Sequence, residues 1–214
     1  MYELEIEAKP KNGYHSSISE HIAGIELTPG EQIEQIEYYF RKIMQTLGLD
    51  LTDDSLKNTP RRVAKMFVNE AFIGLNPSKA PSITLFKNKF KYNETILEKD
   101  IPIFSYCEHH FVPIIGKAHI AYISKGEVIG LSKLNRIAHY CSKRPQVQER
   151  LTIEIAEYLK KVMKIEDVAV FIKAEHLCVA SRGINHTGCA TLTSSLHGQF
   201  LDAKRQELLT LLSL

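Results

Sequence analysis

Four consecutive residues, Cys107-Glu108-His109-His110, carry side chains that can bind a metal ion or move a proton. Cys107 and His110 are three residues apart, a spacing that lets a tight turn direct a thiolate and an imidazole toward one ion, as in the Cys-x-x-His pairs of zinc sites. Two ligands alone bind an ion weakly. The third candidate is Cys178, and 178 minus 107 places it 71 residues further along the chain. A metal site therefore requires a fold that brings the two segments together.

Cys107, His110 and Cys178 would leave one position of a tetrahedral zinc ion open to water, which is the arrangement of catalytic rather than structural zinc. Zinc lowers the pKa of the water that it binds from about 15.7 to about 7, so a nucleophile is available at neutral pH. His109 and His176 lie beside or near a ligand in the sequence, and we interpret them as proton donors and acceptors. The pattern predicts a hydrolase with Zn²⁺ as its cofactor.

Each of these residues taken alone has a more ordinary interpretation. Cysteine is among the residue types most often buried, and histidine is often only a hydrogen-bonding partner within the fold. Cys141 fits that interpretation because it shares an apolar helical face with Leu134 and Ile137, and Cys189 is predicted to be a small strand residue. The combination favours a metal site, since the string His176-Leu177-Cys178 adds to the Cys-x-x-His pair.

A group of cations lies at the predicted start of a helix. Arg61, Arg62 and Lys65 follow Thr59-Pro60, where threonine can cap a helix and proline fits its first turn. Cations there oppose the partial positive charge of the helix end, so helix stability does not explain them. A bound phosphate would explain them, because a helix N-terminus offers free N–H groups to an anion.

The same pattern recurs further along the chain. Ser132 is predicted to cap a helix that begins with Lys133 and Arg136, and Arg182 follows Cys178 by four residues. Each cation taken alone fits a solvated helix face equally well. Because the formal net charge is only +2, the recurrence favours a compact polyphosphate site and argues against a nucleic-acid surface.

Gln148 and Glu149 fall early in the next predicted helix. A carboxylate offers two oxygens to two donors that lie side by side, so Glu149 matches the N1–H and exocyclic amine of guanine. Glutamate is also favourable in the first turn of any helix, so this feature taken alone leaves both interpretations open.

The elements that must position these residues follow from periodicity and punctuation. A helix is predicted from Pro29 to Leu47, ended by Gly48, and another from Thr59 to about Gly74. Short strands follow between Ile83 and Ile123. Two helices come next, and strand-like stretches in VAVFIKAEHLCVAS and CATLTSSLHG complete the pattern. This order predicts an α+β fold with an antiparallel sheet covered by helices on one side, preceded by an N-terminal helical region. The predicted divisions are an arm at 1–28, a helical region at 29–80 and a catalytic domain at 81–214.

Composition sets the remaining limits. The 214 residues are 44% hydrophobic and 24% charged, which is typical of a compact globular protein. No apolar run approaches the roughly 20 residues of a membrane helix, so no membrane partner is expected. The polar, acidic start does not resemble a secretion signal, and four cysteines are too few for a disulfide framework. We therefore expect a cytoplasmic protein.

Five strings carry a family resemblance. NTPRRVAKMFVNEAFIGL, CEHHFVPIIGKAHIAYI, VIGLSKLNRI, RPQVQERLT and HLCVASRGI follow one another between about Leu56 and Phe200. In this order they resemble the GTP cyclohydrolase I family, whereas residues 1–28 and the tail after Phe200 carry no comparable motif.

The resemblance implies a tunnelling fold (T-fold), in which antiparallel sheets of several subunits join into a barrel. It further implies a homodecamer made of two facing pentamers, with active sites between subunits. Such assembly would cover open sheet edges. Domain 81–214 would then be the catalytic T-fold domain, and regulation through the N-terminal arm is left open.

The resemblance also implies a role for each candidate residue. GTP would be the substrate, Zn²⁺ would be held by the three ligands named above, and His109 and His176 would be the acid-base pair. Glu149, helped by Gln148, would hold guanine, and Ser132 would assist the ribose rearrangement. The triphosphate contacts implied are Arg62, Lys65, Lys133, Arg136 and Arg182.

The chemistry implied is a zinc-dependent hydrolysis. Activated water adds to C8 of the purine, the imidazole ring opens, a second hydration releases formate, and the ribose rearranges and recloses to give 7,8-dihydroneopterin triphosphate. This is the first step toward folate or a tetrahydropterin. The polyphosphate contacts would position C8 through remote binding energy. One departure is Cys189, which stands where a small hydroxyl residue is expected.

Two alternatives keep the fold and change the function. One is a zinc-stabilised purine- or pterin-binding protein, or an oligomeric interaction module, in which the histidines only bond to backbone. The other is a different T-fold enzyme that acts on another purine or pterin. Formate release from GTP, and its absence with ATP, separates them.

Overall fold

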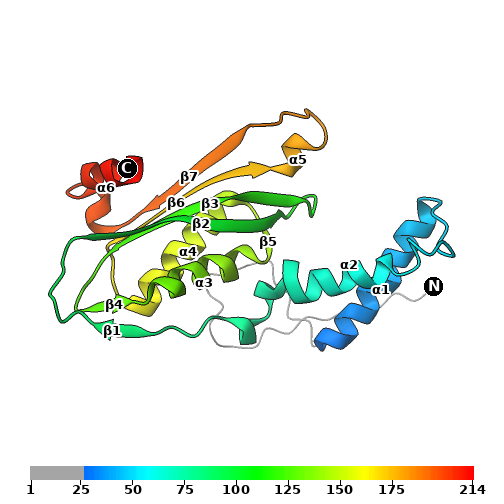
Figure 1. Ribbon diagram of the computed structural model, residues 1–214, viewed down its shortest axis with the longest axis horizontal. Coiled ribbons are helices and arrows are strands. Elements are labelled where there is room, and N and C mark those ends of the chain that lie inside the picture. Colours follow the sequence, from blue (N-terminus) through cyan, green and yellow to red (C-terminus); the bar gives the residue numbers. More distant parts are fainter. Residues whose placement is uncertain (1–26) are drawn as a thin grey trace. The chain divides into compact units, whose positions relative to one another are not determined.

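The computed structural model describes residues 27–214 (Figure 1). The predicted arm at 1–28 lies outside the described residues except for its last two. The chain divides into two compact units between Leu75 and Asn76, and each is described by itself. Within residues 27–214, no helix combines the length and the apolar character needed to cross a lipid bilayer.

The first unit is a pair of helices, α1 (Pro29–Thr46) and α2 (Thr59–Met66). α1 starts with a capping box, in which Thr28 accepts from the Glu31 backbone and Glu31 accepts from the Thr28 backbone. It ends as predicted, with Gly48 at a φ of 78°. α2 continues into a π turn, Phe67–Ala71, and a 3₁₀ turn, Ile73–Leu75.

One of the predicted anion-binding cations has a structural partner in this unit. Arg61 Nη1 on α2 donates to Glu37 Oε2 on α1 at 2.7 Å. This bond joins the two helices, so Arg61 does not need a bound phosphate to explain it.

The second unit is built on a five-stranded sheet in the order β5-β2-β3-β6-β7. Its antiparallel strands are β2 (Thr95–Cys107), β3 (Pro113–Ile123), β6 (Val168–His176) and β7 (Ala190–Leu196), while β5 (Pro145–Gln146) runs parallel to β2. β1 (Leu85–Lys87) and β4 (Glu127–Ile129) form a separate two-stranded ladder. Short 3₁₀ turns lie at Pro77–Lys79 and Gly198–Leu201.

Helices α3 (Leu131–Ser142) and α4 (Gln148–Met163) lie along one face of this sheet (Figure 1). Their apolar stripes bury Leu134, Ile137 and Leu151 against inward-facing strand residues such as Ile103 and Ile120. Among residues 27–214, the other face is covered at one end, where α6 (Arg205–Ser213) contributes Leu208 to a smaller core. The predicted α+β class, with helices on one side of an antiparallel sheet, is confirmed, and α6 is an addition beyond the last motif.

The uncovered part of that second face carries exposed apolar side chains. Phe104 and Ile115 are directly opposite each other on β2 and β3, and Leu192 of β7 lies on the same face. Their exposed fractions are 51%, 42% and 71%.

Two predicted details differ from the structure. The strand expected to run through Cys178 ends at His176, and residues Leu177–Ala180 form a one-turn helix, α5, closed by a bond from Ser181 N to Leu177 O. Ser132 does not cap α3, which begins at Leu131 with Gly130 as its N-cap and no side-chain cap. In both cases a residue preference, for strand at Leu177–Ala180 and for capping at Ser132, does not match the conformation that the backbone adopts there.

Candidate active site

The three predicted metal ligands, Cys107, His110 and Cys178, converge in the second unit and are called the metal group below. Cys107 ends β2, His110 lies in the turn that follows, and Cys178 lies on α5. One ligand atom from each is within 4.8 Å of the other two. The sheet explains this convergence, because β3 pairs with β2 on one side and with β6 on the other, and Ile114 lies opposite His176.

The turn that carries Cys107 and His110, called the metal turn below, is held by hydrogen bonds within its own backbone. Phe111 N donates to Cys107 O at 2.8 Å, and Cys107 N donates to Val112 O at 2.9 Å. Phe111 has a φ of 53°, which reverses the chain within a few residues. Cys107 Sγ and His110 Nδ1 are consequently 3.6 Å apart. This separation suits two ligands of one ion.

The donor set fits zinc. Two sulfurs and one imidazole nitrogen are soft to borderline ligands, which select Zn²⁺ over the oxygen-seeking cations. Burial, and then the neighbouring Cys107 thiol, raise the pKa of Cys178. A divalent cation between the two thiols would reverse that cost by stabilising both thiolates.

His109 lies beside this group without belonging to it. Its Nδ1 is 3.7 Å from Cys107 Sγ, its Nε2 is 3.7 Å from Glu108 Oε1, and its side chain is 64% exposed. An exposed imidazole next to a metal group is accessible to a substrate, as proton transfer requires.

The second predicted proton carrier, His176, is fixed by Gln148. His176 Nε2 is 2.7 Å from Gln148 Oε1. Burial lowers the pKa of His176, and the charge of Glu149 opposes that shift. A histidine with a lowered pKa is neutral at pH 7 and can accept a proton.

The Gln148 side chain is occupied by the fold. It is 1% exposed, and its Nε2 lies 3.0 Å from both Ile172 O and Thr191 O and 3.1 Å from Thr193 Oγ1. Its position therefore suits the orientation of His176, and its predicted contact with guanine stays a prediction. Glu149 is next to it at the start of α4 and is exposed.

Comparison with known proteins identifies the family to which this geometry belongs. The family model described as GTP cyclohydrolase I matches residues 36–213. The chain belongs to the GTP cyclohydrolase I family. It is 57% identical to GTP cyclohydrolase 1 of Flavobacterium johnsoniae, over 83% of this chain and 79% of that protein. For the proteins of the same name from Aeromonas salmonicida and Vibrio cholerae, the identities are 54% and 50%, over 78% and 81% of this chain and 77% and 80% of theirs.

The resemblance read from the motifs is thus confirmed, and so is the expectation that the chain is an enzyme of the GTP cyclohydrolase I family. A solved structure, the archaeosine synthase QueF-Like in the apo form, is similar at a TM-score of 0.40 and 16% identity, over 47% of this chain and 90% of that one. That likeness is too loose to add to the assignment.

The cations predicted for this GTP cyclohydrolase I family member fall into three groups. Arg182, which follows α5, bonds through Nη1 to His110 Nε2, so it lies at the metal group. Lys133 and Arg136 are on the first turns of α3 with Ser132, and no bond joins them to the metal group among the residues that the structure describes. Arg62 and Lys65 are exposed on α2 of the first unit.

Sequence reasoning missed two contacts around the metal turn. Arg150 Nη2 donates to Glu108 Oε2 at 2.5 Å, and Gln146 O accepts from Glu108 N at 3.0 Å. Of the residues involved, only Arg150 and Glu154 have helical spacing, four residues apart on α4, and no spacing in the chain signals the contacts with Glu108.

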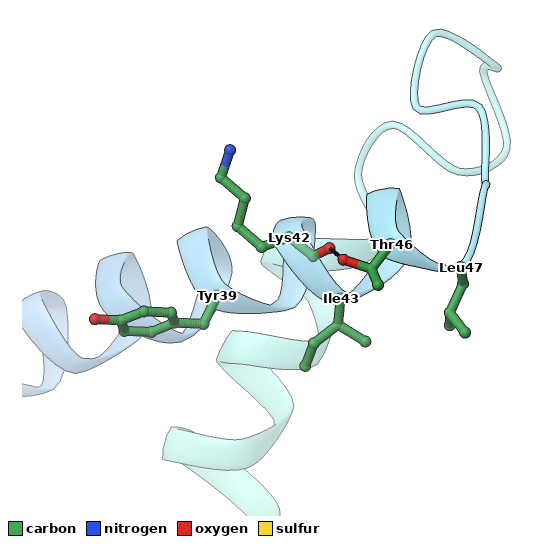
Figure 2. Close-up of a pocket in the computed structure, with 5 residues that line it drawn as sticks. All are labelled: Tyr39, Lys42, Ile43, Thr46 and Leu47. Atoms are coloured by element: carbon green, nitrogen blue, oxygen red, sulfur yellow. Dashed lines mark hydrogen bonds between the residues drawn. The ribbon is translucent and has the colours of Figure 1, made fainter. Parts of the chain in front are cut away.

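A hollow of about 410 Å³ lies elsewhere, on α1 of the first unit. Figure 2 shows its lining by Tyr39, Lys42, Ile43, Thr46 and Leu47, and a bond from Thr46 Oγ1 to Lys42 O at 2.9 Å. It contains none of the predicted site residues and no acid-base pair, so it is not the candidate active site.

Proposed function

We propose that this chain is a zinc-dependent enzyme that hydrolyses GTP to 7,8-dihydroneopterin triphosphate and formate, the first step toward folate or a tetrahydropterin. The observation that carries the proposal is the convergence of Cys107, His110 and Cys178 within 4.8 Å, in a chain of the GTP cyclohydrolase I family. When bound there, zinc would supply Lewis acidity that makes water nucleophilic at neutral pH.

The chain's own residues would divide the remaining work. His109 and His176 would carry protons to and from the purine ring and the ribose, and Ser132 would assist the ribose rearrangement. His176 is suited to accept a proton because burial lowers its pKa and Gln148 fixes its ring. Glu149 would accept from the guanine N1–H and amine, since its carboxylate is exposed beside His176.

The triphosphate would be held by cations. Arg182 is already at the metal group, and the other proposed contacts are Lys133, Arg136, Arg62 and Lys65. Binding at these positions would align C8 with the metal group and retain the intermediates through several steps.

We also propose a homodecamer with active sites between subunits. Two features support assembly: β7 is an edge strand of the sheet, and Phe104, Ile115 and Leu192 leave an apolar patch on its uncovered face. A second set of strands beside these would cover both features. Native mass spectrometry measures the subunit number directly. A monomer at micromolar concentration would contradict this part of the proposal.

The function is tested by incubating the zinc-loaded protein with GTP. Formate is measured, and the pterin product is detected by its fluorescence after oxidation. ATP is the matched control, because it has the same triphosphate and lacks the guanine donors that Glu149 would read. Formate from GTP but not from ATP, abolished in Glu149→Ala, supports the proposal. Absence of formate with a fully zinc-loaded protein contradicts it. We expect this activity in the cytoplasm, where the four unpaired cysteines stay reduced.

A further inference from the structure

A chain of side-chain bonds reaches the metal turn from the interior of the second unit. Glu154 Oε2 accepts from Gln146 Nε2 at 2.8 Å, and Gln146 Oε1 accepts from Arg150 Nε at 2.8 Å. Arg150 Nη2 then donates to Glu108 Oε2 at 2.5 Å. Glu108 stands between the metal ligand Cys107 and the proposed proton carrier His109, so the chain ends inside the candidate active site.

The inner end of this chain is fixed. The Glu154 side chain is 2% exposed, and the Arg144 side chain, 3% exposed, lies 3.7 Å away. Gln146 Nε2 also donates to Cys141 O at 3.1 Å. Glu154 accepts one hydrogen bond, from Gln146, and lies between the cations of Arg144 and Arg150, so moving it would separate opposite charges in the interior.

Arg150 transmits that rigidity. Its guanidinium uses two acceptors on β5, Gln146 Oε1 and, at 3.0 Å, Pro145 O. A guanidinium is planar and its donors are in a fixed fork, so the bonds from Nε to Gln146 Oε1 and from Nη2 to Pro145 O limit the direction of the second N–H of Nη2. That N–H donates to Glu108 Oε2, and this ion pair is only about a quarter exposed at either end.

Glu108 is held at two points. Its backbone N–H donates to Gln146 O at 3.0 Å, and its carboxylate accepts from Arg150. Its second oxygen, Oε1, faces His109 Nε2 at 3.7 Å. His109 is largely exposed, and its other neighbours are Cys107 Sγ at 3.7 Å and the ring of His110, both in the same turn.

We infer that Arg150 is a positioning residue, which holds Glu108 and thereby fixes both the metal-binding turn and the orientation of His109. This inference rests on the proposed function for its kinetic consequence, but its effect on the metal turn does not depend on turnover. It concerns the geometry of the bonds and not the charge of Glu108.

The test compares Arg150→Met and Glu108→Ala with three further variants. The double variant asks whether the two residues act through one contact. Glu108→Gln keeps an oxygen acceptor for Arg150 and removes the charge. Glu166→Gln is the matched control, because Glu166 is itself exposed and pairs with Lys160 at 3.0 Å, away from the turn. Urea unfolding identifies any variant that fails to fold. If Arg150→Met fails to fold, the test relies on Glu108→Ala, because Glu108 lies at a partly exposed turn.

Two readouts are followed: kcat and KM for GTP, and the rate at which a colorimetric chelator removes zinc. We expect Arg150→Met and Glu108→Ala each to lower kcat and to speed zinc loss by about tenfold, as is typical when the support of a metal ligand is removed. KM should stay within about threefold, the double variant should equal the worse single one, and Glu108→Gln should stay near wild type.

Multiplicative losses in the double variant, or a Glu108→Gln variant as poor as Glu108→Ala, would overturn the inference. So would unchanged kcat and zinc loss in Arg150→Met, or the same losses in the Glu166→Gln control. If the wild-type protein releases no formate from GTP, the proposed function fails, and the zinc-loss rates alone then decide the inference. Wild-type zinc loss in both single variants would reject it.

Discussion

The two sides of the metal group are built differently. On one side, Cys107 and His110 lie in a turn closed by two backbone bonds and supported by Arg150 through Glu108. On the other side, Cys178 lies on the single helical turn α5, followed by an exposed segment from Ser181 to Leu192. The first pair of ligands is therefore fixed by local bonds.

Cys178 depends on a longer path. Its position follows from the register of β6 on β3. His176, two residues before Cys178, lies opposite Ile114 in that register. Local contacts therefore set the half of the site that contains Cys107 and His110, and strand pairing sets the half that contains Cys178. The following variants test each half.

Removal of a predicted metal ligand should be the most severe change. Cys178→Ala leaves a thiol and an imidazole, and two ligands hold zinc too weakly to survive dialysis, so both bound zinc and GTP turnover should fall to background. Metal analysis and formate release measure the two losses. Cys189→Ser is the control, because Cys189 is an exposed cysteine outside the metal group. Full zinc content in Cys178→Ala would exclude Cys178 as a ligand.

Removal of a predicted proton carrier should separate metal binding from chemistry. His109→Ala and His176→Ala should retain zinc and lose turnover by roughly 10²–10⁴-fold, which is the usual contribution of a general acid or base. His139→Ala provides the comparison, since His139 is exposed on α3 and touches none of the ligands. Zinc loss in His109→Ala equal to that in Cys178→Ala would show that His109 binds the ion instead.

A change in the sheet should affect only the half that depends on pairing. Gly116 on β3 lies opposite Ala174, and a Cβ there would lie 2.2 Å from Lys173 O. Gly116→Ala must therefore push β6 away from β3, at a cost of about 1–3 kcal/mol or more. The shift moves Cys178 relative to Cys107, so zinc affinity should fall together with the urea midpoint.

Gly130→Ala is the matched control for that variant, because a Cβ there meets nothing closer than 3.6 Å. It should leave zinc affinity near wild type and lower stability by no more than about 1 kcal/mol, because Gly130 is the N-cap of α3 and alanine is a poorer cap than glycine. Normal zinc affinity in a destabilised Gly116→Ala protein would mean that Cys178 is held by contacts other than strand pairing.

The approach of Cys107 and His110 was easier to predict from the sequence than the approach of Cys178. The Cys-x-x-His spacing allows a tight turn to bring Cys107 and His110 together, and their ligand atoms are 3.6 Å apart in the structure. The approach of Cys178 needed both the β2–β3 and β3–β6 pairings, which no spacing in the chain encodes. It followed from the interpretation of all three residues as ligands and from the family resemblance.

Other contacts could not be read from residue types. Gln148 is a reasonable guanine contact by chemistry, yet its amide is satisfied inside the fold by Ile172 and Thr191, which are 24 and 43 residues away. Ser132 is a preferred capping residue, but the cap of α3 is Gly130, two residues earlier. The α+β class survived these local differences because it depends on the order of many elements.

The smallest expected effect concerns the support of His176. Gln148→Leu removes the partner of His176 Nε2 and the amide that donates to Ile172 O and Thr191 O. Loss of these bonds around a buried side chain should lower the free energy of unfolding in urea by about 1–3 kcal/mol. Turnover should fall by about tenfold, because the ring of His176 loses its fixed orientation.

Thr193→Val separates these two effects. It removes one acceptor of Gln148 and the bond to Thr152 Oγ1, and it leaves the contact between Gln148 and His176 in place. It should lower stability by about 1 kcal/mol and keep turnover within twofold of wild type. If Thr193→Val loses as much turnover as Gln148→Leu, the loss comes from general destabilisation, and Gln148 does not orient His176. If only Gln148→Leu loses turnover, the strand-dependent half of the site also has a positioning residue, as the turn has in Arg150.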